Sequence, residues 1–479
     1  MPTASATHVA IAGGGLAGLA AGCALADAGF RVTLFERRPY LGGRASSYQH
    51  PGTGEVVDNC QHVLLGCCTN LIEFYQRLGV QQKIRWYDCL TFLEPGGRAS
   101  AIGAASLPAP FHTLPSFLRA PCLNISDKLS IAAAMAVLAP SLPHDNGQSF
   151  LSWLRQCGQT EAAIDRFWKP ILVSALNEDL DRISVPYAAQ VVRESFLKSA
   201  AAGRMGIPTV PLTDLYSAAA DYITARGGEV HLRSGAESFA PQATGVQLCA
   251  GERKELFDFL VLALPFNGLA SILPQTVQAG PLRRNLAEFS SSPITGIHLW
   301  FDRQITDLDH AVLLDRTIQW MFHKSKLLAG SAGRAGRPPD SRRDAGATAH
   351  GSYVELVVSS SKSLVEKPKR QITELALSEL REFFPEAQFA NLLKSTVIKE
   401  VHATYSPKPG VDRYRPGPET AWPHVFLAGD WIATGWPATM EGAVRSGYLA
   451  AEALVRSTGG SGKFLVPDLP AEGLMQILS

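Results

Sequence analysis

Three glycines near the start of the chain, Gly13, Gly15 and Gly18, have the G-x-G-x-x-G spacing of a loop that binds a dinucleotide pyrophosphate. The first glycine allows a tight turn, the second a close approach of backbone to pyrophosphate, and the third close packing of helix on strand. Glu36 follows 18 residues after Gly18, where a carboxylate can accept hydrogen bonds from both ribose hydroxyls. The spacing therefore predicts a dinucleotide cofactor with an unphosphorylated ribose.

A second glycine pair follows this acid, because Glu36 and the segment 42–44 give the order E-x5-G-G-R. This order resembles the start of the flavin amine oxidase and carotenoid desaturase superfamily. The resemblance implies FAD rather than NAD as the cofactor, with both glycines and the arginine along its pyrophosphate. The predicted cofactor-binding residues of this half of the site are Gly13, Gly15, Leu16, Ala17, Gly18, Glu36, Arg37, Gly42, Gly43 and Arg44.

The other half of the predicted site lies near the end of the chain. A buried strand over residues 425–428 is expected to end at Gly429 and Asp430, so that a short acid reaches a ligand in the crevice beyond the strand. The superfamily resemblance places this carboxylate at a ribityl hydroxyl or beside the pyrophosphate. A helix over residues 440–456 follows, and its N-terminal dipole would stabilise an anionic reduced flavin. The predicted cofactor-binding residues here are Gly429, Asp430, Ala438, Thr439 and Met440.

Asp58 and His62 are the predicted catalytic residues, and His62 is also predicted to contact FAD. Their loop follows the Gly-Gly-Arg segment, and an alternating strand would place residues 58 and 62 on one side, facing one cavity. The family resemblance given below implies that a hydroxyl departs near flavin N5, and an acid at this position would help it to depart. Two alternatives remain open: Asp58 caps the loop and His62 bonds to backbone. Glu441 is either a further acid or serves a helix dipole and cap.

The elements that must position these residues alternate between strands and helices. Residues 8–12 and 32–36 are apolar runs typical of buried parallel strands, and the Ala/Leu-rich helix between them ends at Gly29. A helix over residues 213–226 and a strand over 257–264 are expected to return to the same domain. The predicted fold class is α/β, a Rossmann-type FAD-binding domain with an inserted mixed-sheet and helical substrate domain, like that of flavin amine oxidases.

The proposed boundaries divide the chain into interleaved segments. The discontinuous FAD-binding domain comprises residues 1–83, 205–280 and 415–460, and the substrate domain comprises 84–204 and 281–414.

The substrate domain is expected to contain two strands within residues 84–102, helices broken by prolines over 107–200, and further strands over 290–325 and 351–360. Residues 330–351 are rich in Gly, Ala, Arg and Pro without apolar periodicity, so they are predicted to form a mobile surface loop with four solvated arginines.

Three stretches, residues 57–68, 107–110 and 434–447, resemble one family within this superfamily, the hydroxysqualene dehydroxylases of bacterial hopanoid biosynthesis, also called squalene-associated FAD-dependent desaturases. The resemblance extends through most of the chain and is weakest over 330–351. It implies replacement of the allylic hydroxyl of hydroxysqualene by a hydride from reduced flavin N5, giving squalene. The electron donor stays unidentified.

Two other functions remain open. A carotenoid desaturase or isomerase uses the same FAD-binding fold and a long polyene precursor. A desaturase transfers the hydride in the opposite direction, from the substrate to FAD. A non-catalytic FAD-binding isoprenoid carrier would also retain the motifs at both ends of the chain. Residues 107–118 and 129–138 either line a substrate entrance or pack ordinarily, and Trp431 and Trp436 are either core residues or tunnel wall.

Composition limits the kinds of partner that the chain is expected to bind. The chain has 44 basic and 43 acidic residues, so no global field favours nucleic acid. Its eight cysteines include no C-x-x-C pair and no metal-ligand spacing, which predicts reduced thiols in a cytoplasmic protein and no metal site. No apolar run reaches 18 residues, which argues against a membrane-spanning helix. Peripheral contact with the inner face of the membrane stays open.

Overall fold

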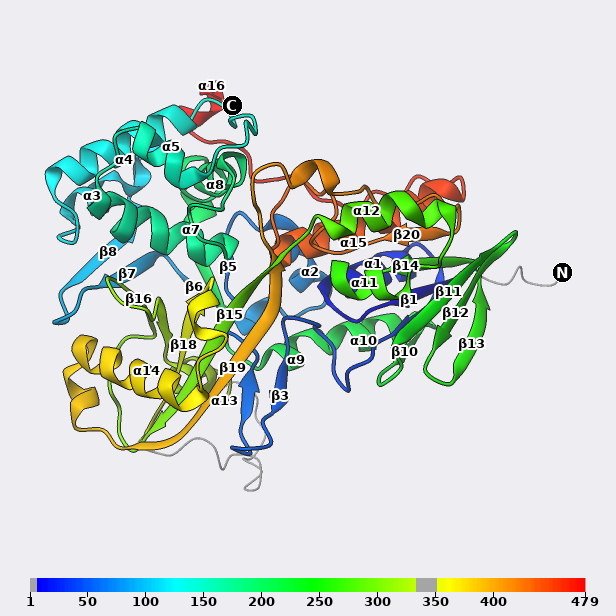
Figure 1. Cartoon of the computed structure of the whole chain (residues 1–479), viewed down its shortest axis with the longest axis horizontal. Coiled ribbons are helices and arrows are strands. Elements are labelled where there is room, and N and C mark those ends of the chain that lie inside the picture. The colour runs from blue at the N-terminus through cyan, green and yellow to red at the C-terminus, as the bar shows by residue number, and fades with distance from the viewer. Residues whose placement is uncertain (1–6, 333–350, 479) are drawn as a thin grey trace.

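The computed structural model describes residues 7–332 and 351–478, and most of the predicted 330–351 loop, with its four arginines, lies outside them. The described chain forms two halves (Figure 1). The N-terminus and a five-stranded sheet lie in one half, on the right of the figure. A seven-stranded sheet, a group of helices and the C-terminus lie in the other.

The five-stranded sheet is parallel throughout, in the order β10-β2-β1-β14-β20. Its strands are β10 (Glu229–His231), β2 (Arg31–Phe35), β1 (His8–Ala12), β14 (Phe259–Leu262) and β20 (Val425–Leu427). A central parallel strand is covered on both faces, which explains the nearly continuous apolar sequence of β1. The predicted strands at 8–12, 32–36, 257–264 and 425–428 are confirmed.

Helix α1 (Leu16–Asp27) is enclosed between this sheet and helix α15 (Met440–Ser457). Residues 16–26 are all buried, because both sides of the helix face protein, and its apolar, Ala-rich sequence suits such a position. Gly447 permits the close approach of the two helices, since a Cβ there would lie 2.2 Å from the Ala17 carbonyl oxygen. A helix from the N-terminal part of the sequence and one from the C-terminal part are therefore packed directly together.

A three-stranded antiparallel sheet packs on the opposite face of the parallel sheet, through residues such as Phe239 and Leu248. Its strands are β11 (Ala236–Gln242), β12 (Gly245–Ala250) and β13 (Arg253–Phe257). Helices α9 (Leu212–Tyr216) and α10 (Ala218–Thr224) replace the single helix predicted over residues 213–226.

The seven-stranded sheet has the order β19-β15-β18-β17-β16-β7-β8 and is antiparallel except between β16 and β7. Its strands are β19 (Leu392–Tyr405), β15 (Ser291–Phe301), β18 (Ser352–Ser359), β17 (Trp320–Phe322), β16 (His310–Leu313), β7 (Cys89–Leu93) and β8 (Ala99–Gly103). Helix α14 (Lys369–Phe383) covers one face with Ile372, Ala376 and Leu380. The strands predicted over 290–325 and 351–360 do complete this sheet.

The helical segment predicted over residues 107–200 is also confirmed. It contains α3 (Leu114–Arg119), α4 (Ile125–Leu138), α5 (Phe150–Gln156), α6 (Glu161–Ala163), α7 (Lys169–Leu176) and α8 (Val185–Val192). Helix α4 begins with a capping box, in which Asn124 and Asp127 each accept a hydrogen bond from the other's backbone N–H. The fully buried Trp168 donates its indole N–H to Gln159 at 2.7 Å within the segment.

Two small sheets connect the halves. One pairs β3 (Ser47–Gln49) with β4 (Val56–Asp58), and the other has the order β5-β9-β6, with β5 (Leu64–Leu65), β9 (Met205–Pro208) and β6 (Ile84–Tyr87). The stretch 84–102 thus contributes to two sheets, not one, because β6 pairs with β9 whereas β7 pairs with β8. The remaining helices are α2 (Thr69–Arg77), α11 (Phe266–Ile272), α12 (Gly280–Ala287), α13 (Lys324–Ala332) and α16 (Met475–Leu478).

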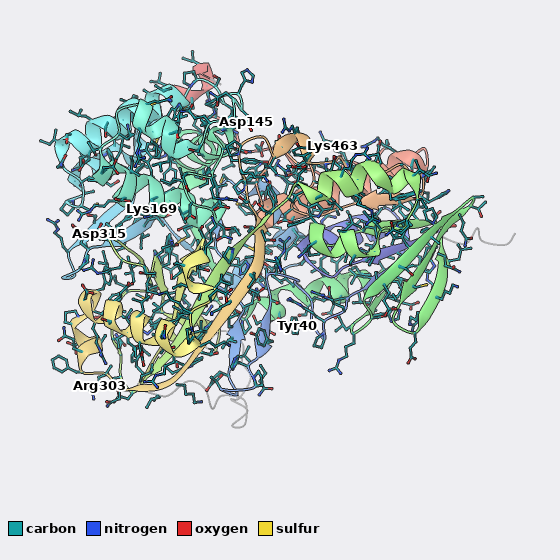
Figure 2. All side chains as sticks on the ribbon, viewed as in Figure 1. Tyr40, Asp145, Lys169, Arg303, Asp315 and Lys463 are labelled. Atoms are coloured by element: carbon teal, nitrogen blue, oxygen red, sulfur yellow. The ribbon has the colours of Figure 1, made fainter. Side chains whose placement is uncertain are left out.

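The labelled side chains in Figure 2 also fall into the half with the parallel sheet or the half with the seven-stranded sheet. Tyr40 and Lys463 lie with the half that contains the parallel sheet, and Lys169, Arg303 and Asp315 with the other. Among the described residues, no helix is both long enough and apolar enough to cross a membrane.

Candidate active site

The glycine-rich turn after β1 has a separate steric reason for each of its three spaced glycines. Gly13 has φ +113°, and a Cβ there would lie 2.4 Å from the Ala263 carbonyl oxygen. Gly18 allows α1 to pack on the turn, because its Cβ would lie 2.0 Å from the Gly13 carbonyl oxygen. A Cβ on Gly15 would meet only the Gly43 Cα, at 3.8 Å. Two glycines therefore serve the fold, and Gly15 leaves space open.

That space belongs to a cavity of about 570 Å³ whose wall includes residues from both the N-terminal and the C-terminal parts of the chain. Its wall includes all the predicted cofactor-binding residues except Gly18, which lies beneath the turn. These wall residues are Gly13, Gly15, Leu16, Ala17, Glu36, Arg37, Gly42, Gly43, Arg44, His62, Gly429, Asp430, Ala438, Thr439 and Met440. Their assignment to FAD contacts remains a proposal, but the structure brings them together.

The chemistry of this wall fits a dinucleotide. Helix α1 begins at Leu16 without a side-chain cap, so its first N–H groups face the cavity as donors for a pyrophosphate. Glu36 is held at the end of β2, where its carboxylate accepts hydrogen bonds from the backbone N–H groups of Gly14 at 2.7 Å and Arg38 at 2.8 Å. A ribose could bind beside this carboxylate, within reach of the same oxygens.

Arg44 and Asp430 join the two halves of the wall. The guanidinium donates to the Asp430 carboxylate at 2.5 Å across 386 positions of sequence, and it also donates to the Ala403 carbonyl. Gly43 has φ +61°, and a Cβ there would lie 2.9 Å from the Gly15 Cα. The Gly-Gly-Arg segment thus lies directly against the first glycine turn, as its proposed role along a pyrophosphate requires.

Arg415 is a positioning residue that sequence reasoning missed. Its buried guanidinium donates to backbone carbonyls of the loop after β20, including those of Asp430 at 3.3 Å and Trp436 at 2.7 Å. It also donates to the Tyr187 hydroxyl at 2.6 Å. No spacing in the sequence marks this arginine, because its partners are mostly carbonyls. It fixes the path of the loop that carries Asp430 to the cavity.

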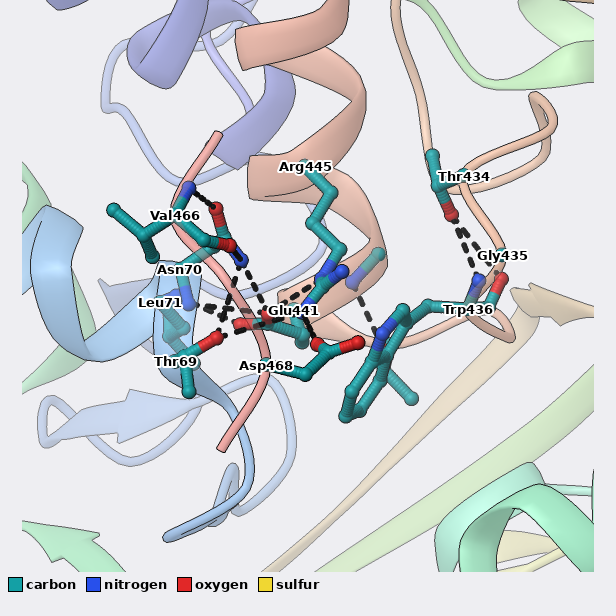
Figure 3. Close-up of polar contacts among 12 residues, drawn as sticks. Thr69, Asn70, Leu71, Thr434, Gly435, Trp436, Glu441, Arg445, Val466 and Asp468 are labelled. Atoms are coloured by element: carbon teal, nitrogen blue, oxygen red, sulfur yellow. Dashed lines mark hydrogen bonds and ion pairs between the residues drawn. The ribbon is translucent and has the colours of Figure 1, made fainter. Parts of the chain in front are cut away.

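The start of helix α15 is also held tightly. Thr439 caps it, accepting a hydrogen bond from the Gly442 N–H at 3.1 Å. The Glu441 carboxylate caps another helix, because it accepts hydrogen bonds from the Asn70 and Leu71 N–H groups at the start of α2 (Figure 3). Arg445 pairs with Glu441 at 2.6 Å. Glu441 is therefore a capping residue, the alternative that the sequence left open beside an acid role.

A second cavity, of about 240 Å³, adjoins the first and is lined mainly by apolar side chains. Helices α7 and α8 contribute Ile171 and Val191, and the seven-stranded sheet contributes Phe322 and Val357. Residues common to both walls include Gln61, Val63, Thr439 and Met440. The two cavities therefore meet where the second half of the cofactor site begins.

The structure bears on the sequence alternatives for the substrate path. Residues 107–118 and 129–138 line neither of these two cavities, so their role as a substrate entrance stays a prediction. Trp436 lies in the wall of the second cavity, whereas Trp431 is fully buried in the core. Its indole N–H donates to the Leu264 carbonyl at 2.9 Å.

The prediction that Asp58 faces the cavity is wrong. Asp58 ends β4 and is buried, accepting hydrogen bonds from the Ser47 hydroxyl at 2.5 Å and from Lys324 Nζ at 2.6 Å. Burial alone would raise the pKa of this carboxyl, but the Lys324 ammonium outweighs it and holds the pKa below its ordinary value. The chain leaves the extended path after residue 58, so alternation does not carry through to residue 62.

His62 does line the first cavity, and it also makes the backbone bond that was its alternative reading. Its Nδ1 lies 2.7 Å from the Cys60 carbonyl oxygen. A carbonyl only accepts, so Nδ1 carries the proton and donates it. Burial lowers the pKa of His62, which leaves Nε2 as an acceptor near neutral pH. His62 is thus prepared to accept a proton rather than to act as the predicted acid.

Two thiols near the cavities are stabilised in the protonated form. Burial raises the pKa of Cys60, and a hydrogen bond with Cys67 together with burial raises the pKa of Cys68. All eight cysteines are free. Within the described ranges, no group of three or more His, Cys, Asp or Glu side chains is arranged to hold a metal ion.

Comparison with known proteins adds three findings. Residues 16–455 match the family described as flavin containing amine oxidoreductase. The chain is 28% identical over 475 residues to the 15-cis-phytoene desaturase of Synechococcus elongatus, covering 94% of this chain and 96% of that one. Two solved structures share the fold. Putrescine oxidase has a TM-score of 0.70 and 16% identity, covering 94% and 99% of the two chains. An oxidoreductase from Methanosarcina mazei has a TM-score of 0.68 and 17% identity, covering 94% and 100%.

Proposed function

The chain belongs to the flavin containing amine oxidoreductase family, and from this premise we propose that it removes the allylic hydroxyl of hydroxysqualene to give squalene. FAD is its cofactor, and the chain is an FAD-dependent oxidoreductase of the carotenoid desaturase type. In the proposed reaction the alcohol and reduced FAD give the hydrocarbon, water and oxidised FAD. The reaction would serve triterpenoid or hopanoid biosynthesis.

One observation carries this proposal. The stretches 57–68 and 434–447, which resemble the hydroxysqualene dehydroxylases, both line the apolar cavity where it meets the cofactor cavity. From the first come Gln61 and Val63, and from the second Trp436 and Thr439. Part of each stretch that resembles the proposed family therefore lies where a substrate would bind.

The bound cofactor would supply a hydride at N5 of its reduced flavin. The protein would supply a dry, apolar chamber, in which an allylic cation forms without capture by water. The α15 N-terminus, held by Thr439 and Glu441, would place the positive end of a helix dipole at the junction of the cavities. Ionised Asp58 and neutral His62 would not supply the proton for the departing hydroxyl. The reduced cofactor carries two hydrogens, so it would supply this proton as well as the hydride.

The test is a single anaerobic turnover. The FAD-loaded protein is reduced with dithionite and mixed with hydroxysqualene, and the flavin absorbance and the organic extract are followed together. Squalene should appear in proportion to the flavin that is reoxidised. If the flavin stays reduced and the alcohol is recovered unchanged, the proposed reaction is wrong. An FAD-binding isoprenoid carrier would bind the alcohol without either change.

A second candidate is desaturation of a carotenoid precursor, which the similarity to a phytoene desaturase over nearly the whole chain favours. Here the substrate loses a hydride and a proton, and His62 Nε2 would be a suitable acceptor for the proton. The oxidised protein should then be reduced by 15-cis-phytoene or ζ-carotene under anaerobic conditions. Reduction by either carotene, without reaction of the reduced protein with hydroxysqualene, would establish this candidate in place of the first.

We also propose that helix α4 contacts the membrane that supplies the isoprenoid. Its outer face is apolar, with Ile125 77% and Leu129 66% exposed, and the exposed Leu118 of α3 is nearby in sequence. Both helices lie at the outer edge of the molecule (Figure 1). The protein should sediment with vesicles of phosphatidylethanolamine and phosphatidylglycerol, and the I125S/L129S variant should not. Equal sedimentation of the variant would exclude this surface.

A further inference from the structure

Gln61 occupies the wall that the two cavities share, and both ends of its side-chain amide are engaged by neighbours. Its Oε1 accepts a hydrogen bond from Lys324 Nζ at 2.9 Å. Its Nε2 donates to the His62 carbonyl oxygen at 3.0 Å. The amide therefore has a defined place between a buried cation and the loop that carries His62.

These partners fix the orientation of the amide. An ammonium group can only donate, so it requires the oxygen of Gln61, and a carbonyl can only accept, so it requires the nitrogen. The two requirements agree, and a flipped amide would fail both. One N–H of Nε2 goes to His62, and the second has no partner among the residues that the structure describes. Gln61 is thus a hydrogen-bond donor with one proton to spare at the junction of the cavities.

Lys324 is itself held in place by the buried charge of Asp58 and by the nearby carboxyl group of Glu355. Its side chain is only 3% exposed, and Nζ lies 2.6 Å from the Asp58 carboxylate and 3.6 Å from the Glu355 carboxyl group. Helix α13, strand β4 and strand β18 supply these three residues. A charge buried so completely persists only with partners, and these fix the ammonium opposite the Gln61 oxygen.

We propose that Gln61 is a specificity residue that donates a hydrogen bond to the oxygen of an isoprenoid alcohol, and that Lys324 is the positioning residue that keeps its amide in the donor orientation. The inference rests on the proposed function, because a hydrocarbon substrate has no oxygen to accept this bond. A donor left unpaired in a mainly apolar wall would disfavour a hydrocarbon of the same length. Gln61 would therefore select the alcohol over the product.

The experiment measures binding without turnover, using the oxidised FAD-loaded protein. Hydroxysqualene and squalene are titrated separately, and binding is read from the perturbation of the flavin absorbance and from equilibrium partition. The wild-type protein should bind the alcohol more tightly than the hydrocarbon. In Gln61→Leu the preference should fall by about tenfold, the value of one hydrogen bond in a buried site.

Further variants separate orientation from general disruption. Gln61→Glu keeps an oxygen acceptor toward Lys324 but has no N–H, so it should lose the preference for the alcohol as Gln61→Leu does. It replaces the leucine variant in the experiment if the leucine variant does not retain FAD. The pair of changes K324Q and D58N removes both charges together and lets the Gln61 amide turn over. Its preference should fall by about twofold, because half of the orientations still donate. Glu94→Gln disturbs ion pairs with Arg98 and Arg166 away from both cavities and should keep the full preference.

The possible results are distinct. If Gln61→Leu and Gln61→Glu retain the preference for alcohol while the reduced wild-type protein converts hydroxysqualene, the role of Gln61 is wrong and the proposed function stands. If the wild-type protein binds both ligands equally and does not convert the alcohol, the proposed function fails as well.

Discussion

Replacement of Gly15 by alanine would separate cofactor binding from folding. Gly15 has φ −78° and ψ 175°, a conformation open to any residue, and its new methyl group would come no closer than 3.8 Å to a protein atom. We therefore expect the free energy of unfolding without FAD to change by less than about 1 kcal/mol. Alanine restricts the unfolded chain more than glycine does, so this change should be a small increase in stability. The methyl group would instead occupy the space through which a pyrophosphate approaches α1.

Gly13→Ala is the matched control with the opposite expectation. It requires alanine at φ +113°, with its Cβ 2.4 Å from a backbone oxygen, which should cost about 2 kcal/mol or more of folding stability. Gly15→Ala should raise the Kd for FAD at least tenfold, equivalent to about 1.4 kcal/mol. The loss would come from displacement of the pyrophosphate from the helix N-terminus.

Stability is measured by urea unfolding of both apoproteins. FAD binding is measured by titrating each apoprotein with FAD and recording the quenching of flavin fluorescence. Gly15→Ala should unfold like the wild type and bind FAD weakly. If it instead binds FAD with wild-type affinity, the pyrophosphate does not pass Gly15 and the assignment of this turn is refuted. If both variants unfold early, the distinction between a glycine for binding and a glycine for folding is wrong.

Three other changes test separate parts of the structure. Gly447→Ala should lower both the unfolding midpoint and the FAD content of the purified protein, because its Cβ would lie 2.2 Å from the Ala17 carbonyl; retention of both would show that α1 and α15 can move apart. Arg415→Met leaves several buried carbonyls unpaired and should cost about 3 kcal/mol in chemical denaturation, whereas a loss under 1 kcal/mol would contradict its role in holding the loop. Burial raises the pKa of Glu355 to about 8, so the folded state holds this proton more tightly than the unfolded chain and stability should fall as pH rises from about 4.5 to 8. Glu355→Gln should flatten that decline by a few kcal/mol in denaturation series at several pH values, and an unchanged slope would refute the assignment.

The cofactor frame was predictable from the sequence because its signals are local. The turn at Gly13, the strand before it and the acid at Glu36 all follow from spacing within one βαβ unit. Gly429 and Asp430 were found for a similar reason, since a strand that ends in a small residue and an acid places both at the crevice of a parallel sheet. Their meeting with Arg44 depends on tertiary packing, and only the superfamily resemblance indicated it.

The catalytic assignments were less predictable, because protonation depends on neighbours that are distant in sequence. The sequence alone predicts Asp58 as an acid, because the ammonium group that keeps it ionised belongs to Lys324, 266 positions away. Likewise Gln61 carried no signal of its own, since an amide becomes a directed donor only when its partners are known. Arg415 was missed because backbone carbonyls, its main partners, leave no trace in residue types.

The junction of Arg44 with Asp430 also bears on how the protein is made. At ordinary translation rates of about 5 to 20 residues per second, the 386 positions that separate them take roughly 20 to 80 s to synthesise. During that interval α1 lacks the cover of α15, and β14, once it has been synthesised, lacks the neighbour that β20 provides. Cofactor loading therefore has to wait until the second half of the site has been synthesised. Until then the nascent chain exposes the apolar side of α1, a natural target for a chaperone.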